Sequence, residues 1–179
     1  MRTGREVIKT GKGGMPSPFD TIGKSFRLIF FSEKALLTLM LDRRHTFNVF
    51  FMYAVSLVIP YKGLDGIVHP ENFGHIVESV MLTAIYIGLL YLYLPKTKGV
   101  FFAAVRVILS FESTAVLLPL TFFMTDQQLR YFHPIFLAWY LSLSVFAVSK
   151  MKGYGYILST VVVFGAFVAT VIFPAFFMG

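Results

Sequence analysis

Apolar residues gather in five stretches along the chain, and short polar segments separate them. A helix needs ~20 apolar residues to cross the ~30 Å hydrocarbon core of a bilayer. The first stretch is short by this measure and Pro60 closes it, so this span is expected to begin earlier, near Arg43. The pattern predicts transmembrane helices near residues 47–61, 76–94, 101–124, 135–149 and 154–178, which form a membrane domain over 46–179.

The segment before the first span is amphipathic. Its apolar positions recur at helical spacing: Phe19, Ile22, Phe26, Ile29, Phe30, Leu36, Leu37 and Met40. Basic and polar residues share another face, and this density of charge argues against a spanning helix. We predict an amphipathic interfacial helix over residues 19–45 on the cytoplasmic surface, although a helix packed on the spans fits the same pattern. The side chains expected to contact anionic headgroups or a partner are Lys24, Arg27, Lys34, Arg43 and Arg44.

Residues 1–18 form a basic, glycine-rich tail. This segment lacks the apolar surface that would offset the entropy of ordering, so it is expected to be flexible alone and to dock on another molecule. It has no apolar core followed by a small-residue cleavage site, so we expect no cleaved signal peptide. The first span is then the insertion signal.

Lysine and arginine alternate between the two sides of the predicted membrane domain. Nine precede the first span, and the four following segments carry one (Lys62), two (Lys96 and Lys98), one (Arg130) and two (Lys150 and Lys152). Because cytoplasmic loops are enriched in basic residues, the N-terminus is predicted to be cytoplasmic and the C-terminus outside. The net charge of +7 is thus a topological signal, and no nucleic-acid partner is expected.

The composition supports a membrane protein. Hydrophobic residues make up 56% of the chain and charged residues 14%, which is outside the usual balance of soluble domains. With no cysteine, the chain has neither disulfides nor thiolate metal sites. The sequence therefore predicts an all-α integral membrane protein, a five-helix bundle preceded by the amphipathic helix.

The order of these parts resembles the Yip domain family of Ypt/Rab-interacting membrane proteins and their prokaryotic relatives, over residues 18–178. The resemblance lies in the segment FDTIGKSFRLIFFSEKALLTLML, the turn and span PKTKGVFFAAVRVILSFESTAVLLPL, and Trp139 in the fourth span. It implies a five-helix bundle with a cytoplasmic N-terminus. The chain departs from eukaryotic members, which carry a long N-terminal region with a DLYGP-like motif. Rab binding is therefore not expected, and a prokaryotic inner membrane is the predicted location.

Three charged residues fall within the predicted spans: Glu78, Arg106 and Glu112. Ionisable side chains are costly in a bilayer, so each is a functional hypothesis. Arg106 is close enough to the cytoplasmic side to extend to headgroups, and its functional alternative is an anion or lipid contact. Glu112 lies near the middle of its span, where it serves either as a structural hydrogen-bond partner or as a proton or cation relay. Arg106 and Glu112 do not share a face of an ideal helix, so the partner of Glu112 is expected on another span.

Histidine and acidic residues in the outer segments raise the question of a metal site. His69, His75 and Glu78 are weak candidates, because imidazole and carboxylate suit zinc. Their spacing lacks a specific ligand motif, so we expect neither a metal nor another cofactor. His45, beside two arginines, is expected at the cytoplasmic boundary.

Small residues in the last predicted span form two pairs four residues apart, Gly155 with Ser159 and Gly165 with Ala169. Such pairs permit close approach of helix backbones. They predict a packing face, either for a span of this chain or for another protein.

The leading functional hypothesis is a non-enzymatic interaction or scaffold protein, an accessory subunit that binds anionic lipids and other membrane subunits. The alternative is a small oligomeric channel or transporter that uses Glu112. A membrane enzyme ranks third, because no nucleophile with a positioned base is recognisable.

Overall fold

Helices dominate the chain, as the sequence predicts. The computed structural model describes residues 16–64, 66–68, 73–95, 99–153 and 155–177, so most of the predicted basic tail lies outside the described residues. The elements are α1 (Pro18–Ile29), α2 (Glu33–Leu41), the 3₁₀ turn η1 (Arg43–His45), α3 (Thr46–Ser56), β1 (Tyr61–Gly63), β2 (Gly66–Val68), α4 (Phe73–Tyr93), α5 (Val100–Phe111), the 3₁₀ helix η2 (Glu112–Phe123), α6 (Asp126–Lys152) and α7 (Tyr156–Phe177).

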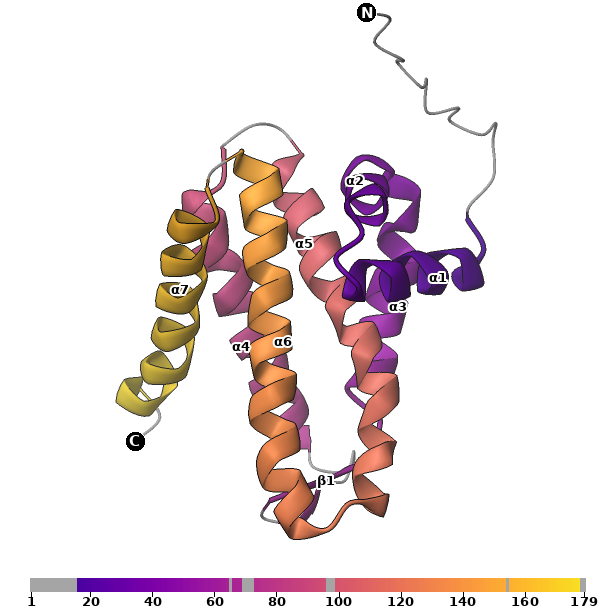
Figure 1. Cartoon of the computed structure of the whole chain (residues 1–179), viewed down its shortest axis with the longest axis vertical. Coiled ribbons are helices and arrows are strands. Elements are labelled where there is room, and N and C mark those ends of the chain that lie inside the picture. Colours follow the sequence, from indigo (N-terminus) through magenta and orange to yellow (C-terminus); the bar gives the residue numbers. More distant parts are fainter. Residues whose placement is uncertain (1–15, 65, 69–72, 96–98, 154, 178–179) are drawn as a thin grey trace, which may run out of the picture.

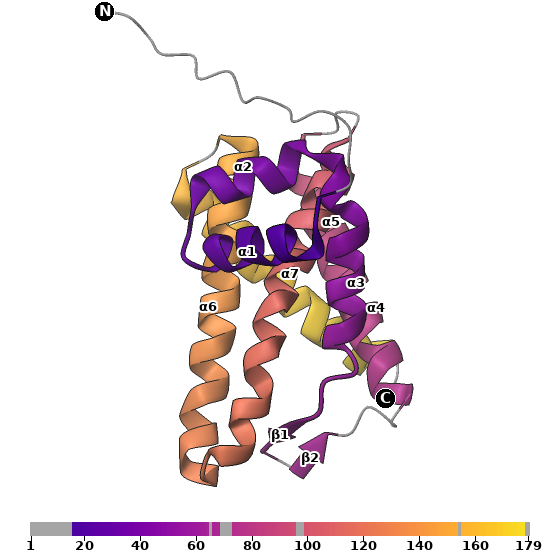
Figure 2. The same ribbon diagram turned by 90° about the vertical axis from the view of Figure 1, so that its right-hand side faces the viewer.

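The long helices run along the long axis of the molecule, and α1 and α2 lie across it (Figures 1 and 2). Helix α2, the start of α5 and the end of α6 lie at one end of the bundle, here called the α2 end. The antiparallel hairpin β1–β2, in which Tyr61 pairs with Val68, lies at the opposite end, here called the hairpin end. The N-terminal basic segment and the last basic turn of α6 therefore share the α2 end.

Two of the described helices are long and apolar enough to cross a membrane: α4, over Ile76–Tyr93, and α6. Helix α5 and the Tyr156–Ile172 part of α7 are apolar but shorter. The outward side of α7 is covered with large apolar side chains, among them Ile157, Val161, Phe164 and Val171. Water solvates such a continuous apolar surface poorly, whereas lipid solvates it well.

The segment predicted as the first span is helical for 11 residues only. At a rise of ~1.5 Å per residue, α3 covers ~17 Å, about half of a bilayer core. The chain then turns after Ser56 and continues extended, because Pro60 has no amide hydrogen to continue a helix. Strand β1 docks on η2, where the Lys62 amide donates to the Thr121 hydroxyl at 2.8 Å.

The predicted third span changes helix type at Glu112, where α5 gives way to the 12-residue η2. Runs of 3₁₀ helix longer than about four residues are uncommon, because their hydrogen bonds are poorly aligned. Here hydroxyls bond to carbonyls three residues back, Thr114 to Phe111 and Thr121 to Leu118, and Pro119 lacks an amide donor. These residues favour the tighter helix, which also lengthens the span, since each residue rises ~2.0 Å instead of ~1.5 Å.

The predicted interfacial helix is two helices, not one. Phe31 adopts a left-handed conformation with φ of 59°, and Ser32 caps the start of α2 by accepting from the Ala35 amide. Helix α1 turns a small face with Thr21 and Ser25 onto the bundle. Its large residues Phe19 and Phe30 point away and are 83% and 73% exposed. Only part of the predicted apolar face therefore contacts the bundle: Ile29 is buried, whereas Phe19 and Phe30 are exposed.

Side chains of the bundle hold α1 and α2 in place. The Trp139 indole donates to the Ile29 carbonyl at 3.0 Å, and Lys150 pairs with Glu33 at 2.9 Å. Both contacts join α6 to the N-terminal helices. The segment 18–41 therefore packs on the bundle, as in the packed-helix alternative, and its outward side chains Phe19 and Phe30 are exposed.

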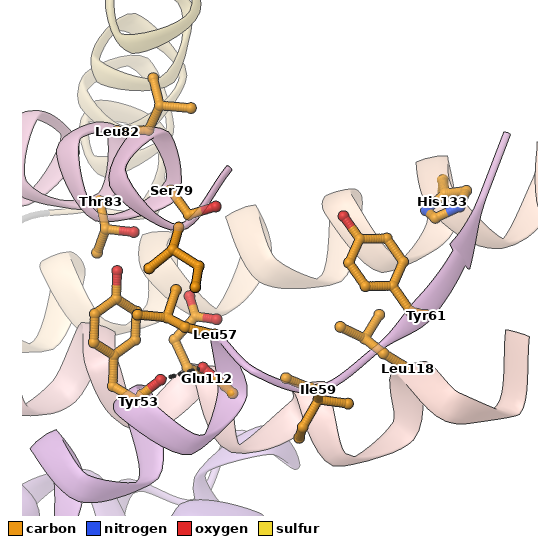
Figure 3. Close-up of a pocket in the computed structure, with 13 residues that line it drawn as sticks. Tyr53, Leu57, Ile59, Tyr61, Ser79, Leu82, Thr83, Glu112, Leu118 and His133 are labelled. Carbon is orange, nitrogen blue, oxygen red and sulfur yellow. Dashed lines mark hydrogen bonds between the residues drawn. The ribbon is translucent and has the colours of Figure 1, made fainter. Parts of the chain in front are cut away.

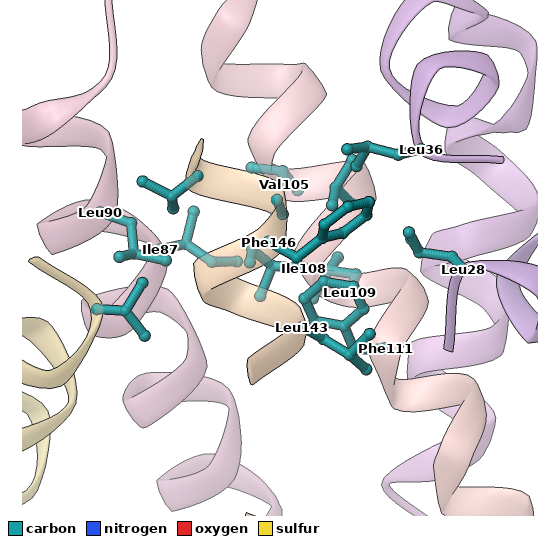
Figure 4. Packing of buried hydrophobic residues seen from close by; sticks show 14 of the residues in the cluster. Leu28, Leu36, Ile87, Leu90, Val105, Ile108, Leu109, Phe111, Leu143 and Phe146 are labelled. Carbon is teal, nitrogen blue, oxygen red and sulfur yellow. The ribbon is translucent and has the colours of Figure 1, made fainter. Parts of the chain in front are cut away.

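The main hydrophobic core lies toward the α2 end (Figure 4). Phe111 of α5 is fully buried there with Leu28 of α1, Leu36 of α2 and Leu143 of α6, and Leu90 joins them from α4. The other half of the bundle, toward the hairpin end, contains a cavity.

Candidate functional site

A half-open cavity of about 410 Å³ lies in the hairpin half of the bundle (Figure 3). Helices α3, α4, η2 and α6 and strand β1 contribute its walls. Its polar lining residues come from all five elements: Tyr53, Ser56, Tyr61, Ser79, Thr83, Glu112 and His133. Leucine and isoleucine side chains fill the remaining wall. Pockets of this size and mixed lining are typical of small-molecule sites.

Glu112 lies at the inner end of the cavity, where α5 changes into η2 (Figure 3). In the part of the chain that the structure describes, its carboxylate has neither a hydrogen-bond partner nor an ion pair. Its charge is close enough to influence the hydroxyls of Tyr53 and Tyr140. An uncompensated carboxylate in an apolar environment is costly, so the site is suited to a ligand that supplies positive charge or a proton.

The other end of the cavity is formed by Tyr61 and His133 (Figure 3). The His133 Nε2 atom is buried and, among the described residues, has no hydrogen-bond partner. The Tyr53 hydroxyl at the inner end is likewise buried and points toward the Thr83 side chain. Buried polar atoms in native folds are nearly always paired, so the unpaired Nε2 atom of His133 indicates a site that water or a ligand fills.

Arg106 does not approach Glu112. It is 2% exposed and donates from Nε to the Leu39 carbonyl at 2.8 Å and from Nη2 to the Met40 carbonyl. A third bond reaches the Thr46 hydroxyl at 3.4 Å. A guanidinium at the end of α2 satisfies carbonyls that have no partner within the helix, and its charge complements the helix dipole. The structure thus gives Arg106 an anchoring role, but on protein carbonyls and not on lipid headgroups.

Glu78, the third charged residue of the predicted spans, is exposed on the first turns of α4 and does not line the cavity. The side chains of His69 and His75 lie outside the described residues. Among the residues that the structure describes, no group of three acidic or histidine side chains could hold a metal ion. The weak metal alternative therefore stays a prediction.

The five basic residues predicted to contact headgroups or a partner all lie toward the α2 end, but their surroundings differ. Arg27 and Lys34 are exposed, whereas Lys24 bonds to Asp20 at 2.6 Å. Arg44 forms a bidentate pair with Asp42. The Arg43 guanidinium lies against Gly99, where a Cβ atom would come within 3.3 Å of it. Of the five, Arg27 and Lys34 are thus the most available for anionic headgroups.

On α7, the small residues divide between two faces. Ser159 is fully buried and faces the bundle together with Ala166. Gly165 and Ala169 are exposed, and the space beside Gly165 is open. Gly155 is also exposed. Packing within this chain uses Ser159, whereas Gly165 and Ala169 face away from the bundle.

A polar network that the sequence did not indicate joins α1 to α3. His45 is fully buried, with Nδ1 at 2.8 Å from the Thr21 hydroxyl and Nε2 at 3.0 Å from the Lys24 ammonium. Because an ammonium group only donates, Nε2 accepts and the proton of neutral His45 is on Nδ1. Asn48 completes the network by donating to Thr21 and to the Pro16 carbonyl.

We expect this network to weaken in acid. Burial lowers the pKa of His45, and the neighbouring Lys24 charge lowers it further, against smaller opposing effects of Asp42 and Asp20. Since its pKa in the folded state is below the ordinary value of 6.5, the unfolded state binds more protons, and stability is lost as pH falls below about 6.5. Asp42 stays ionised over this range, because hydrogen bonds from Arg44 hold its pKa at about 2.

Thermal unfolding in detergent between pH 8 and pH 5 measures this effect. The unfolding midpoint of the wild type is expected to fall, and subtracting the profile of His45→Gln isolates the contribution of this residue. Parallel profiles for the two proteins would contradict the assignment.

Comparison with known proteins adds no assignment: no family model, no characterised protein and no solved structure matches this chain. The resemblance to the Yip domain family therefore stays a prediction. The cavity and the His45 network consist of single polar residues spread over several elements. No local motif signals them, although Glu112, which the sequence singled out, lines the cavity.

Proposed function

We propose that the protein is an integral membrane protein that crosses the bilayer five times and transports a small cation through the cavity that ends at Glu112. The spans are α3 with its extended continuation, α4, α5 with η2, α6 and α7. The outward apolar face of α7 and the position of the basic N-terminal helices at the α2 end support this topology. The α2 end is then cytoplasmic, and the hairpin end and the C-terminus are outside, as expected in a prokaryotic inner membrane.

The cavity is the observation that carries the proposal. It extends from Tyr61 and His133, near the hairpin end, to Glu112 in the middle of the bundle. Solutes from the outer side therefore reach a carboxylate that lacks a partner in the described structure. Beyond Glu112 the closely packed core around Phe111 closes the route. Transport then requires a change in conformation, and the α5–η2 junction is suited to it, because a 3₁₀ segment within a helix often marks a hinge.

Reconstituted liposomes test the proposal. Under an inside-negative potential, influx of protons, sodium, potassium and methylammonium is compared between liposomes with the protein and empty liposomes. Faster influx of at least one cation is expected, whereas equal rates for all four would remove the transport proposal.

A second function, an accessory subunit of a membrane assembly, is favoured by the exposed Gly165 and Ala169 on α7. A helix of another protein can approach closely there. The predicted Yip domain resemblance favours the same function. Purification in mild detergent should then yield a complex that Gly165→Leu dissociates, and a lone wild-type chain would count against this alternative.

A further inference from the structure

The cavity of the proposed function has features of a site for an organic cation and not for a bare inorganic ion. Glu112 is the one carboxylate among the described lining residues, and neither lysine nor arginine is among them. The nearby Lys62 is turned away, because its ammonium pairs with Asp126 at 2.8 Å and bonds to the Met124 carbonyl. The charge of the cavity therefore selects for a cation.

The size and the walls of the cavity argue for a ligand with an apolar body. Inorganic cations in proteins are held by several converging oxygen atoms, six or more for Ca²⁺ and Mg²⁺. Here the hydroxyl and carboxylate groups are spread over a space of about 410 Å³, more than ten times the ~30 Å³ that one water takes. Leu57, Ile59, Leu82 and Leu118 lie between the polar groups. A hydrated inorganic ion would make poor contact with these apolar side chains, whereas the hydrocarbon part of an organic ligand would cover them.

The two ends of the cavity differ in what they recognise. At the inner end, Glu112 lies beside the ring of Tyr53 (Figure 3), and a carboxylate with an aromatic ring is suited to an ammonium group through charge and cation–π attraction. At the other end, the buried His133 Nε2 atom has no partner in the described part of the chain, and the Tyr61 hydroxyl lies near it. This end accommodates a polar group.

From these observations we infer that the cavity binds an organic ammonium ion with an apolar or aromatic body, its ammonium at Glu112 and a hydrogen-bonding group toward His133. The inference shares one premise with the proposed function, which is that this cavity is the site where the ligand binds. It does not depend on whether the ligand crosses the membrane. Glu112 is ionised in the complex, because the bound ammonium supplies the counter-charge that the chain does not.

Binding to the purified full-length protein in mild detergent tests this inference. The probes are phenethylammonium, its neutral analogue 2-phenylethanol, the anion phenylacetate, and sodium chloride. Titration calorimetry and the shift of the unfolding midpoint are the two measurements. Phenethylammonium is expected to bind saturably, with a Kd at least about tenfold lower than that of 2-phenylethanol, because a charged hydrogen bond contributes that much or more. Phenylacetate and sodium are expected to give no saturable shift.

Two matched variants locate the ammonium. Glu112→Gln keeps the shape of the side chain and should raise the Kd for phenethylammonium at least about tenfold. Glu78→Gln makes the same chemical change at an exposed position on α4, outside the cavity lining, and should leave the Kd unchanged. The unfolding midpoint without ligand checks that both variants fold. Equal binding of the cation and the alcohol, or a Kd that Glu112→Gln does not change, would overturn the inference.

The far end of the site is tested with tyramine, which adds a hydroxyl to phenethylammonium. Tyramine is expected to bind more tightly to the wild type, and His133→Phe should remove this difference. Equal affinities of the two amines for the wild type would overturn the role of His133.

The inference and the proposed function fail in different ways. If inorganic cations cross liposome membranes but phenethylammonium neither binds nor competes with them, the inference is wrong and transport stands. If phenethylammonium binds in a Glu112-dependent way and no cation crosses, the inference stands and transport is wrong.

Discussion

Replacing Arg106 by methionine is expected to lower the unfolding midpoint in detergent by ~6–12 °C. The substitution keeps much of the side-chain length but removes the bonds to the carbonyls of Leu39 and Met40 at the end of α2. Hydrogen bonds of a charged group contribute ~1.5–3 kcal/mol each to stability. The variant also avoids the cost of burying a charged guanidinium, which offsets part of the lost stability. A net loss of about 3 kcal/mol corresponds to this midpoint shift in a domain of this size.

The control for Arg106 is Arg27→Met, which makes the same chemical change at an exposed position on α1. Surface substitutions usually change stability by no more than ~0.5 kcal/mol. Limited trypsin digestion adds a local measurement, because detachment of α2 from Arg106 should speed cleavage at the exposed Lys34. Equal midpoints for Arg106→Met and the wild type would show that α2 does not depend on this anchor.

Replacing Glu112 by glutamine is expected to reduce cation influx into liposomes at least about tenfold. The amide has the same shape but no charge, so it loses both the attraction for a cation and the ability to exchange a proton. A tenfold change in rate corresponds to only ~1.4 kcal/mol, which is less than the loss of one charged hydrogen bond. Glu78→Gln, whose parent side chain lies outside the cavity lining, should retain wild-type influx.

Expression and folding must be equal for this comparison to be informative. The unfolding midpoint and the yield of each variant are therefore measured beside the influx. Unchanged influx in a well-folded Glu112→Gln protein would exclude both the relay and the cation-binding role, and would leave Glu112 a structural residue.

Helical periodicity and long apolar runs were sufficient to predict the helical class and the approximate bounds of α4 and α7, whereas α6 begins at Asp126, nine residues before the predicted span 135–149. Their hydrophobic signals extend over 20 or so residues, so local exceptions do not change the result. The split of residues 18–41 was not predictable in the same way. It depends on the conformation of the single residue Phe31 and on a Ser32 cap, and helix periodicity continues across both.

The candidate site was predictable only in part. Glu112 was identified from the sequence, because a carboxylate in the middle of an apolar span is costly in any fold. The structure around Glu112 was not predictable, since helical periodicity does not distinguish the 3₁₀ helix η2 from a continuation of α5. Tyr61 was predicted at the end of the first span and His133 in an outer loop, whereas the structure places them in β1 and in α6, and only the tertiary arrangement brings them to one cavity.

The central claim is that the bundle spans the membrane and that its cavity opens on the outer side. Thiol labelling tests this claim most directly. The chain has no cysteine, so single substitutions report on one position each. Ser79 lines the cavity, and Lys34 is exposed on α2 at the opposite end of the bundle. In sealed right-side-out vesicles, a membrane-impermeant maleimide should label Ser79→Cys at once and Lys34→Cys only after permeabilisation. Labelling of Lys34→Cys from outside, or of Ser79→Cys only after permeabilisation, would contradict a membrane-spanning bundle whose cavity opens on the outer side.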